Sequence, residues 1–121
     1  MAEPDVLDAS VIESLRQLTP PGDPDVLTEV LQIFRQESPR RLERLRIAWA
    51  AGNIEEMCRA AHSLKGSAGN LGARRLFSVC AQLDDAGRAG DLAKCAPLVD
   101  ALGTEFTKVE LEIGRLLDQH R

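Results

Sequence analysis

The chain has 121 residues, of which 44% are hydrophobic and 28% are charged, and its formal net charge at pH 7 is −4. This length fits one domain with a single core, and the composition is ordinary for a soluble globular protein. The negative charge disfavours nucleic acid or an anionic membrane as a partner, and no apolar run approaches the roughly 20 residues that span a bilayer. With three Phe, one Trp and no Tyr, the chain has fewer aromatic residues than β-sandwiches and barrels usually carry, so we expect an all-α fold.

The cysteines and the first residues bear on the compartment. Cys58, Cys80 and Cys95 are odd in number and fit no tight metal or redox spacing, so we expect three reduced thiols. The start of the chain is acidic and lacks the basic and apolar regions of a signal peptide. Both features predict a cytoplasmic protein.

Apolar residues at spacings of three and four predict helices throughout. A short first helix is expected from about Asp8 to Leu18. Asp23 is predicted to cap the second helix, with Pro24 at its first position, and Pro39 to kink or restart that helix. The residues expected to face inward are Leu7, Val11, Leu15 and Leu18 in the first helix and Leu27, Leu31, Phe34, Leu42, Leu45 and Trp49 in the second.

Three more helices follow. Asn53 is expected to cap the third, about residues 54–71, in a capping box with Glu56, and Gly72 to end it. The fourth covers about residues 73–88. The fifth helix is expected to start near Ala96, after a short turn from Asp91, because Pro97 is tolerated best in the first turn of a helix. The inward residues are Ile54, Met57, Ala61, Leu64, Ala68 and Leu71, then Leu76, Cys80 and Leu83, then Leu92, Cys95, Val99, Leu102, Phe106, Val109, Ile113 and Leu116.

Four long amphipathic segments joined by short turns predict an antiparallel four-helix bundle, with the first short helix capping one end. We expect one domain over residues 1–121, with its core at about 24–118, and a monomer. Met1 and the complete bundle favour a free-standing protein over a segment of a larger one.

The most informative segment is the run AHSLKGSAGNLG at residues 61–72. On a helical wheel His62 lies on the order of 130° from the mean direction of the inward residues, so we expect it to be mostly exposed. Lys65, Gly66 and Gly69 follow on the same side, and Glu55, Cys58 and Arg59 lie on the preceding turns of that side.

The two glycines of this run need an explanation. Each costs roughly 1 kcal/mol relative to alanine inside a helix, and folding alone requires neither Gly66 nor Gly69 at an outward position. Their lack of side chains lowers the surface beside His62, so that a second protein could bring a reactive group to the imidazole.

An exposed imidazole is largely neutral at pH 7, and its free nitrogen can attack a phosphoryl group. Phosphoryl transfer then needs alignment and cations rather than further covalent help. Lys65 is the first candidate cation, and Arg59, which points in a different direction, is the second. Taken alone, a surface histidine on a helix is usually without function, and the surrounding run is what outweighs that interpretation; His120 is expected to be such an inert residue.

The run at residues 61–72 closely resembles the signature of the histidine-containing phosphotransfer (HPt) domain of bacterial phosphorelays, and similar helix lengths and order extend over about residues 26–116. The resemblance implies that His62 accepts a phosphoryl group from a receiver-domain aspartyl phosphate, such as that of a hybrid sensor histidine kinase, and donates it to a second receiver of a response regulator. It also implies that Lys65 balances phosphoryl charge and that Gly66, Ser67 and Gly69 lie near the partner. The Mg²⁺ belongs to the receiver, so no cofactor of this chain is implied.

The chain departs from the family at one position. Members often carry a glutamine on the following helix near the histidine, where this chain has Asp84. A carboxylate there would favour the protonated imidazole and repel phosphoryl oxygens. Gln82 lies about 200° around the helix from Asp84 and cannot substitute for it.

Other chemistries fit less well. Lys65-Gly66-Ser67 inverts the order of a P-loop and no strand precedes it, so we expect no ATP site and no autokinase activity. Cys58 and His62 could form half of a zinc site, but no second ligand pair is evident. Glu-x-x-His pairs for a di-iron bundle and a third partner for a serine hydrolase are missing as well. The remaining alternatives are a receiver-binding adaptor that exchanges no phosphate and a metal-binding bundle.

Overall fold

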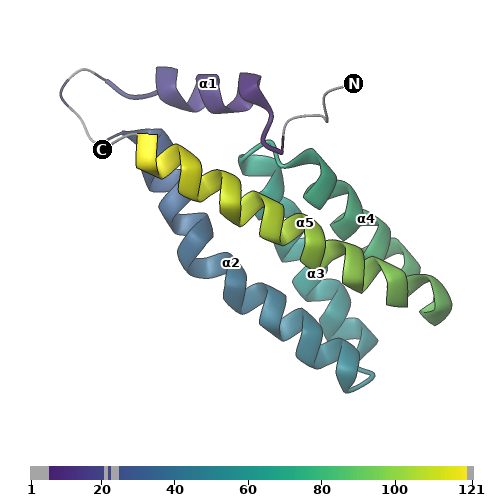
Figure 1. Ribbon diagram of the computed structural model, residues 1–121. Helices are drawn as coiled ribbons and strands as arrows, with labels where there is room; N and C mark the ends of the chain where they lie inside the picture. The colour runs from purple at the N-terminus through teal and green to yellow at the C-terminus, as the bar shows by residue number, and fades with distance from the viewer. Residues whose placement is uncertain (1–5, 21, 23–24, 120–121) are drawn as a thin grey trace.

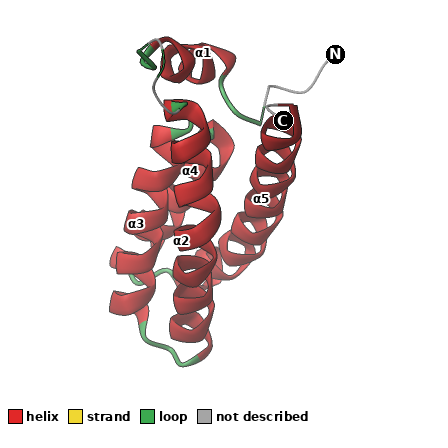
Figure 2. Cartoon of the chain, turned by 90° about the vertical axis from the view of Figure 1, so that its left-hand side faces the viewer, coloured by secondary structure: helices red, strands yellow, loops and turns green. Residues whose placement is uncertain are grey.

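The computed structural model describes residues 6–20, 22 and 25–119. The described chain forms five helices and no strand: α1 (Ala9–Gln17), α2 (Val26–Ala50), α3 (Ile54–Asn70), α4 (Arg74–Arg88) and α5 (Leu92–Gln119). Helices α2 to α5 run lengthwise, while α1 lies across one end of them (Figures 1 and 2). The predicted all-α four-helix bundle with a short capping helix is therefore confirmed. Among these helices, none combines the length and apolar character that crossing a membrane requires.

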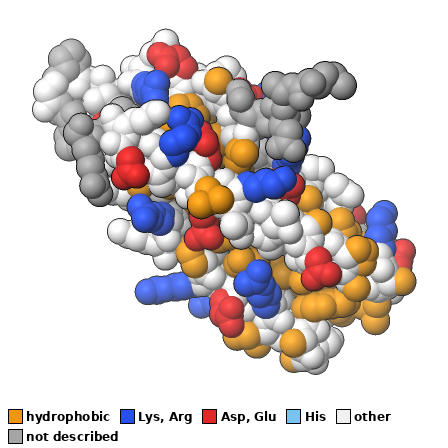
Figure 3. Space-filling model, viewed as in Figure 1, with side chains coloured by type: hydrophobic (Ala, Val, Ile, Leu, Met, Phe, Trp, Pro, Cys, Tyr) orange, Lys and Arg blue, Asp and Glu red, His pale blue; other side chains and the backbone are white. Residues whose placement is uncertain are grey.

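The bundle is packed unevenly. α3 has its most extensive contacts with α4 and nearly as many with α2, whereas α5 packs mainly on α4 and only lightly on α2. α3 and α5 lie on opposite sides of the bundle (Figure 2). Figure 3 shows the α5 side, where acidic and basic side chains are interspersed and hydrophobic ones gather near the start of α5. The core of the most completely buried side chains draws on α2 to α5 and the turn after α3, with Leu27, Leu31, Leu45, Met57, Leu64, Leu71, Leu76, Leu83, Leu102 and Ile113.

Side-chain caps fix where the helices begin. The carboxylate of Asp25 accepts from the backbone N–H of Leu27 at 3.1 Å, so α2 is capped by Asp25 rather than by the predicted Asp23; Asp23 and Pro24 lie outside the described residues. Asn53 caps α3 as predicted, accepting from the N–H of Glu56 at 3.2 Å. The reciprocal half of a capping box is absent at Asn53, because its own N–H donates to the carbonyl of Ala48.

Two prolines lie inside helices, where the sequence led us to expect a kink or restart of the second helix at Pro39 and a start of the fifth helix near Ala96; no restart occurs at Pro39, and the fifth helix starts earlier than expected. α2 continues through Pro39, and α5 begins at Leu92, well before Pro97. Each ring removes one backbone hydrogen bond, but the affected turn of each helix has exposed positions at which water can hydrate the free carbonyl. The early start of α5 is supported by Asp91, whose side chain accepts from the N–H of Lys94 at 3.1 Å.

The buried side of α1 also differs from the expected one. Leu7 is buried as predicted, but Leu18 is 64% exposed and Ile12 takes the buried position within the helix. The reason is tertiary: the start of α1 is fixed to the α3–α4 turn. The N–H of Asp8 donates to the carbonyl of Gly72 at 2.9 Å, and the Asp8 carboxylate pairs with Arg74. Hydrogen bonds from Ser10, with Arg74 beside them, lower the pKa of Asp8.

α3 and α4 pack tightly against each other at Gly87. A Cβ added there would lie 2.4 Å from the sulfur of Cys58 and 3.1 Å from the terminal methyl of Met57. Glycine at this position thus lets the two backbones approach, with Cys58 filling the space. Cys58, Cys80 and Cys95 are all buried and unpaired, as predicted, and burial raises the pKa of each thiol, that of Cys80 to about 12.

We predict that Gly87→Ala destabilises the fold by about 1–3 kcal/mol, because the new methyl group overpacks the α3–α4 contact. Urea unfolding followed by circular dichroism measures this change. Gly114→Ala is the matched control, since open space surrounds that helical position and alanine favours a helix by up to about 1 kcal/mol. In Cys58→Ala/Gly87→Ala the loss should be smaller than the sum of the single effects; strict additivity would contradict the assigned contact.

Candidate functional site

His62 lies on the outer side of α3, and its side chain is 64% exposed. The inward positions of the same helix explain this: Met57, Ala61, Leu64 and Ala68 are completely buried and turn the opposite side of α3 to solvent. The predicted exposure of the imidazole is confirmed. A large partner can therefore reach it without any rearrangement of the core.

One acidic side chain from α4 faces this imidazole. Oδ2 of Asp84 lies 3.9 Å from Nδ1 of His62, although the Asp84 side chain itself is only 8% exposed. Its other oxygen accepts from Nε of Arg88 at 2.8 Å, and this bond raises the pKa of Arg88. The prediction that Asp84 lies beside His62 is confirmed, whereas Gln82 is exposed and donates to Ser78.

Lys65 rests on an aromatic ring rather than extending freely. Its Nζ lies 5.9 Å from the centre of the Phe77 ring, within the range of a cation–π contact. The same ring approaches within 3.5 Å of the position that a Cβ on Gly69 would take. A side chain at Gly69 would thus make only ordinary van der Waals contact with Phe77, so the packing does not require glycine at this exposed position.

Gly66 fits its predicted role more closely. No atom lies within 4 Å of a Cβ built on this residue, so the surface one turn after His62 is bare. Nothing in the packing requires glycine there. Glycine destabilises a helix relative to alanine, and no contact in the structure compensates for this cost.

Two neighbours predicted on the His62 side have other surroundings. Arg59 is paired with Glu55 at 2.9 Å and Glu56 at 3.6 Å on its own helix, which weakens its case as a second cation for the phosphoryl group. Cys58 is buried against α4, where its Sγ donates to the carbonyl of Asp84 at 3.6 Å.

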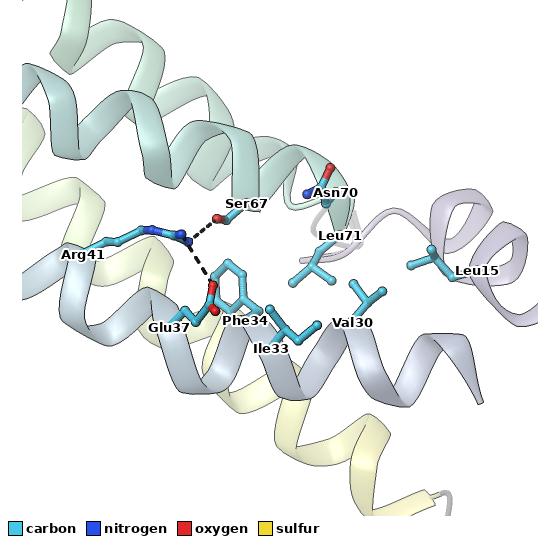
Figure 4. Close-up of a pocket in the computed structure, with 9 residues that line it drawn as sticks. All are labelled: Leu15, Val30, Ile33, Phe34, Glu37, Arg41, Ser67, Asn70 and Leu71. Carbon is cyan, nitrogen blue, oxygen red and sulfur yellow. Dashed lines mark hydrogen bonds and ion pairs between the residues drawn. The ribbon is translucent and has the colours of Figure 1, made fainter. Parts of the chain in front are cut away.

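Ser67 faces α2 and not the histidine. Its Oγ accepts from Nη1 of Arg41 at 2.9 Å, and Arg41 also reaches Glu37 (Figure 4). This polar cluster closes one end of a groove of about 390 Å³ between α1, α2 and α3. Apolar side chains line the rest of the groove, among them Leu15, Val30, Ile33 and Leu71. The groove begins on α3 little more than one turn after His62.

Sequence reasoning missed three residues of this region. Arg88 had a usable signal, because it follows Asp84 by four positions on one helix. Phe77 had a weaker one, as a rare aromatic residue next to the buried stripe of α4. Arg41 had none, because its partner Ser67 is 26 positions away. Over the described ranges, no three His, Cys, Asp or Glu side chains are grouped so that they could hold a metal ion.

Comparison with known proteins gives consistent matches. The family described as the Hpt domain matches residues 29–119. Histidine-containing phosphotransfer protein 2 of Arabidopsis thaliana is 22% identical over 102 residues, which cover 82% of this chain and only 65% of that protein. Histidine-containing phosphotransfer protein B (HptB) from Pseudomonas aeruginosa PAO1 superimposes with a TM-score of 0.88 at 28% identity, covering 98% of this chain and all of the other. A maize histidine-containing phosphotransfer protein, ZmHP2, shares the fold with a TM-score of 0.81 at 20% identity, over 96% of this chain and 88% of that one.

Proposed function

Because the chain belongs to the Hpt domain family, whose members are phosphotransfer intermediates in phosphorelays, we propose that His62 is the residue that carries the phosphoryl group. The observation that supports this assignment is the 64% exposed imidazole next to the bare backbone of Gly66. His62 lies on the solvent side of α3, where a partner can reach its ring.

In this proposal, a receiver domain of a hybrid sensor histidine kinase docks with its aspartyl phosphate against His62. A ring nitrogen attacks phosphorus, the P–O bond to the aspartate breaks, and the electron pair leaves with that carboxylate. A response-regulator receiver later takes the group in the reverse sense. Each receiver supplies the Mg²⁺, and the chain contributes no ATP site of its own.

Lys65 is the cation that we assign to the phosphoryl oxygens. At rest its ammonium lies over Phe77, a contact worth only about 0.5–1 kcal/mol at an exposed site. The stem of lysine is flexible, so the ammonium can leave the ring for a more strongly charged phosphoryl group at little cost. Phe77 thus keeps the cation on the α4 side of the histidine between transfers.

The docking surface also includes the groove between α1, α2 and α3. It is continuous with the site along α3 through Ser67, and Ile33 at its edge is 53% exposed. We assign the groove to an apolar segment of the receiver, because an exposed apolar groove next to a reactive group favours one partner covering both. We take the protein to be a monomer in the cytoplasm, because unpaired thiols persist in that compartment.

Incubation with a phosphorylated receiver tests the central assignment. The label should move to this chain, be lost in acid and survive in base, as expected for a phosphoramidate. His62→Gln should remain folded and take up no label. His62→Gln that is labelled like the wild type would disprove the assignment. A wild-type chain that binds several receivers but is never labelled would instead support the alternative of a non-phosphorylated adaptor.

Gly66→Leu should slow phosphoryl transfer strongly, because the new side chain fills the space next to His62 that the receiver needs for docking. Thermal unfolding should show an equal or higher Tm, since leucine is the better helix former by up to about 1 kcal/mol. Gly114→Leu, at an equally open position on α5, is the control and should transfer at the wild-type rate. Normal transfer by Gly66→Leu would show that this glycine has another purpose.

Ile33→Asp should weaken receiver binding by about tenfold, the effect of charging one buried interface residue. Titration calorimetry or surface plasmon resonance measures the change in Kd. Leu111→Asp is the matched control, because Leu111 is 71% exposed on α5 and lies outside the groove. Equal affinity of both variants would remove the groove from the docking surface.

A further inference from the structure

The short helix α1 has little buried surface to hold it against the bundle. It is shorter than the roughly 12–15 residues that an isolated helix needs in water, and of its residues Ala9–Gln17, all of which the structure describes, Ile12 is the buried one. Open grooves of about 390 and 520 Å³ follow its two flanks, the first against α2 and α3 and the second against α5. An element held by so few apolar contacts can open locally while the other helices stay packed.

Hydrogen bonds tie both ends of α1 to the bundle. At its start, the N–H of Asp8 donates to the carbonyl of Gly72 at 2.9 Å, and the Asp8 carboxylate pairs with Arg74. At its other end, Oγ1 of Thr19 accepts from the N–H of Val26 at 2.9 Å. We call the contacts of Asp8 with Gly72 and Arg74 the Asp8 clasp. Its ion pair contributes little, because the side chain of Arg74 is 81% exposed.

The Asp8 clasp borders the aromatic ring that carries Lys65. A pocket of about 240 Å³ lies between Asp8 and Val11, the turn at Gly72 and the ring of Phe77. A Cβ on Gly72 would lie 2.8 Å from that of Asp8 and 2.9 Å from that of Val11, so a glycine lets α1 come this close to the turn. Phe77 is 42% exposed. Its ring therefore has open space on one side, and α1 forms the opposite wall of that space.

We infer that α1 is a movable strap that couples the groove between α1, α2 and α3 to the position of Lys65. Leu15 points from α1 into this groove (Figure 4). An apolar segment of a receiver that enters the groove pushes Leu15, and α1 with it, away from α2 and α3. The Asp8 clasp opens, the wall of the pocket withdraws, and Phe77 turns into the enlarged space. Lys65 then loses its aromatic support and is released.

The coupling follows from the position of two contacts on one short helix. Leu15 lines the groove, whereas Val11 and the capping Asp8 line the pocket at Phe77. Displacing the helix at one contact therefore changes the wall at the other. By linkage, a docked segment favours the open clasp as strongly as the open clasp favours docking. The inference rests on the proposed function for the occupant of the groove and for the use of the released lysine, which would bind phosphoryl oxygens only when a donor is docked.

Amide exchange in the unphosphorylated protein, measured by NMR, tests whether the strap opens as described. Arg74→Ala should speed the exchange of the Asp8 N–H by about two- to fivefold, as expected for the loss of an exposed ion pair. Ile12→Ala, which removes the buried side chain of α1, should speed it by about tenfold or more. Leu18→Ala is the matched control, because Leu18 is 64% exposed, and it should leave the exchange rate unchanged.

The chemical shifts of the Lys65 side chain test the connection to Phe77. Protons above a phenyl ring are shifted upfield, so the CH₂ group next to the Lys65 ammonium should be upfield in the wild type and should lose this shift in Phe77→Leu. Ile12→Ala should move the signal toward its position in Phe77→Leu, whereas Leu18→Ala should not move it. Circular dichroism verifies that Ile12→Ala is folded. Arg74→Ala, which changes no buried side chain, replaces it if it is not.

An unphosphorylated receiver domain is the probe for the groove. A bound partner usually slows amide exchange, but here docking should speed the exchange of the Asp8 N–H and move the Lys65 signal in the same direction as Ile12→Ala does. In Ile33→Asp, which weakens docking, the same changes should require a higher receiver concentration.

An exchange rate of the Asp8 N–H that is slowed or unchanged at saturating receiver would overturn the inference. So would a Lys65 signal at the same position in the wild type and in a folded Ile12→Ala. Neither measurement requires phosphorylation of the chain. If both respond as expected but no receiver labels His62, the coupling stands and the proposed function fails. If His62 is labelled while receiver binding leaves the Asp8 clasp closed, the proposed function stands and the strap is disproved.

Discussion

The close contact of α3 and α4 is the constraint on which the site depends. Gly87 has no side chain, so Cys58 can fill the space against it and the two backbones approach. Because the helices are antiparallel, one turn forward on α3 meets one turn back on α4. His62 therefore meets Asp84, and further along Gly69 meets Phe77. A single register places the carboxylate and the aromatic ring on the same side of the histidine.

This register gives the site an asymmetric form. On the α4 side, His62 has a charged group and a ring that carries Lys65. On the side of α2, beyond the bare Gly66, lies the groove that Arg41 and Ser67 close. Support for the imidazole thus comes from one neighbouring helix, and room for a partner comes from the other. The cationic side chains of Arg88 and Lys65 also lie on the α4 side, where they would oppose the negative charge of the phosphoryl group that we propose for His62.

Much of the fold follows from the sequence, because the apolar spacing of three and four is strong in α2 to α5 and the turns carry clear signals such as Gly72, with φ +69°. The errors arose where tertiary contacts overrode local preference. Pro39 and Pro97 remain within helices whose packing outweighs one lost hydrogen bond each. Ile12 replaces Leu18 on the buried side of α1, because Asp8 binds the turn at Gly72.

Only those features of the site that depend on a single helix could be predicted from the sequence. The apolar periodicity of α3 was enough to predict that His62 is exposed and that Gly66 lies on an open surface, since both properties follow from the helical wheel of one helix. Phe77 lies beside Gly69, and Arg41 donates to Ser67; neither neighbour can be found without the packing of a second helix. Asp84 shows the intermediate case. Its place near the histidine followed from spacing, but its effect depends on Arg88, which takes up one of its oxygens and leaves the other to face the imidazole. What the sequence suggests as a lone negative charge next to the histidine is, in the folded protein, a buried carboxylate that is paired with the guanidinium of Arg88.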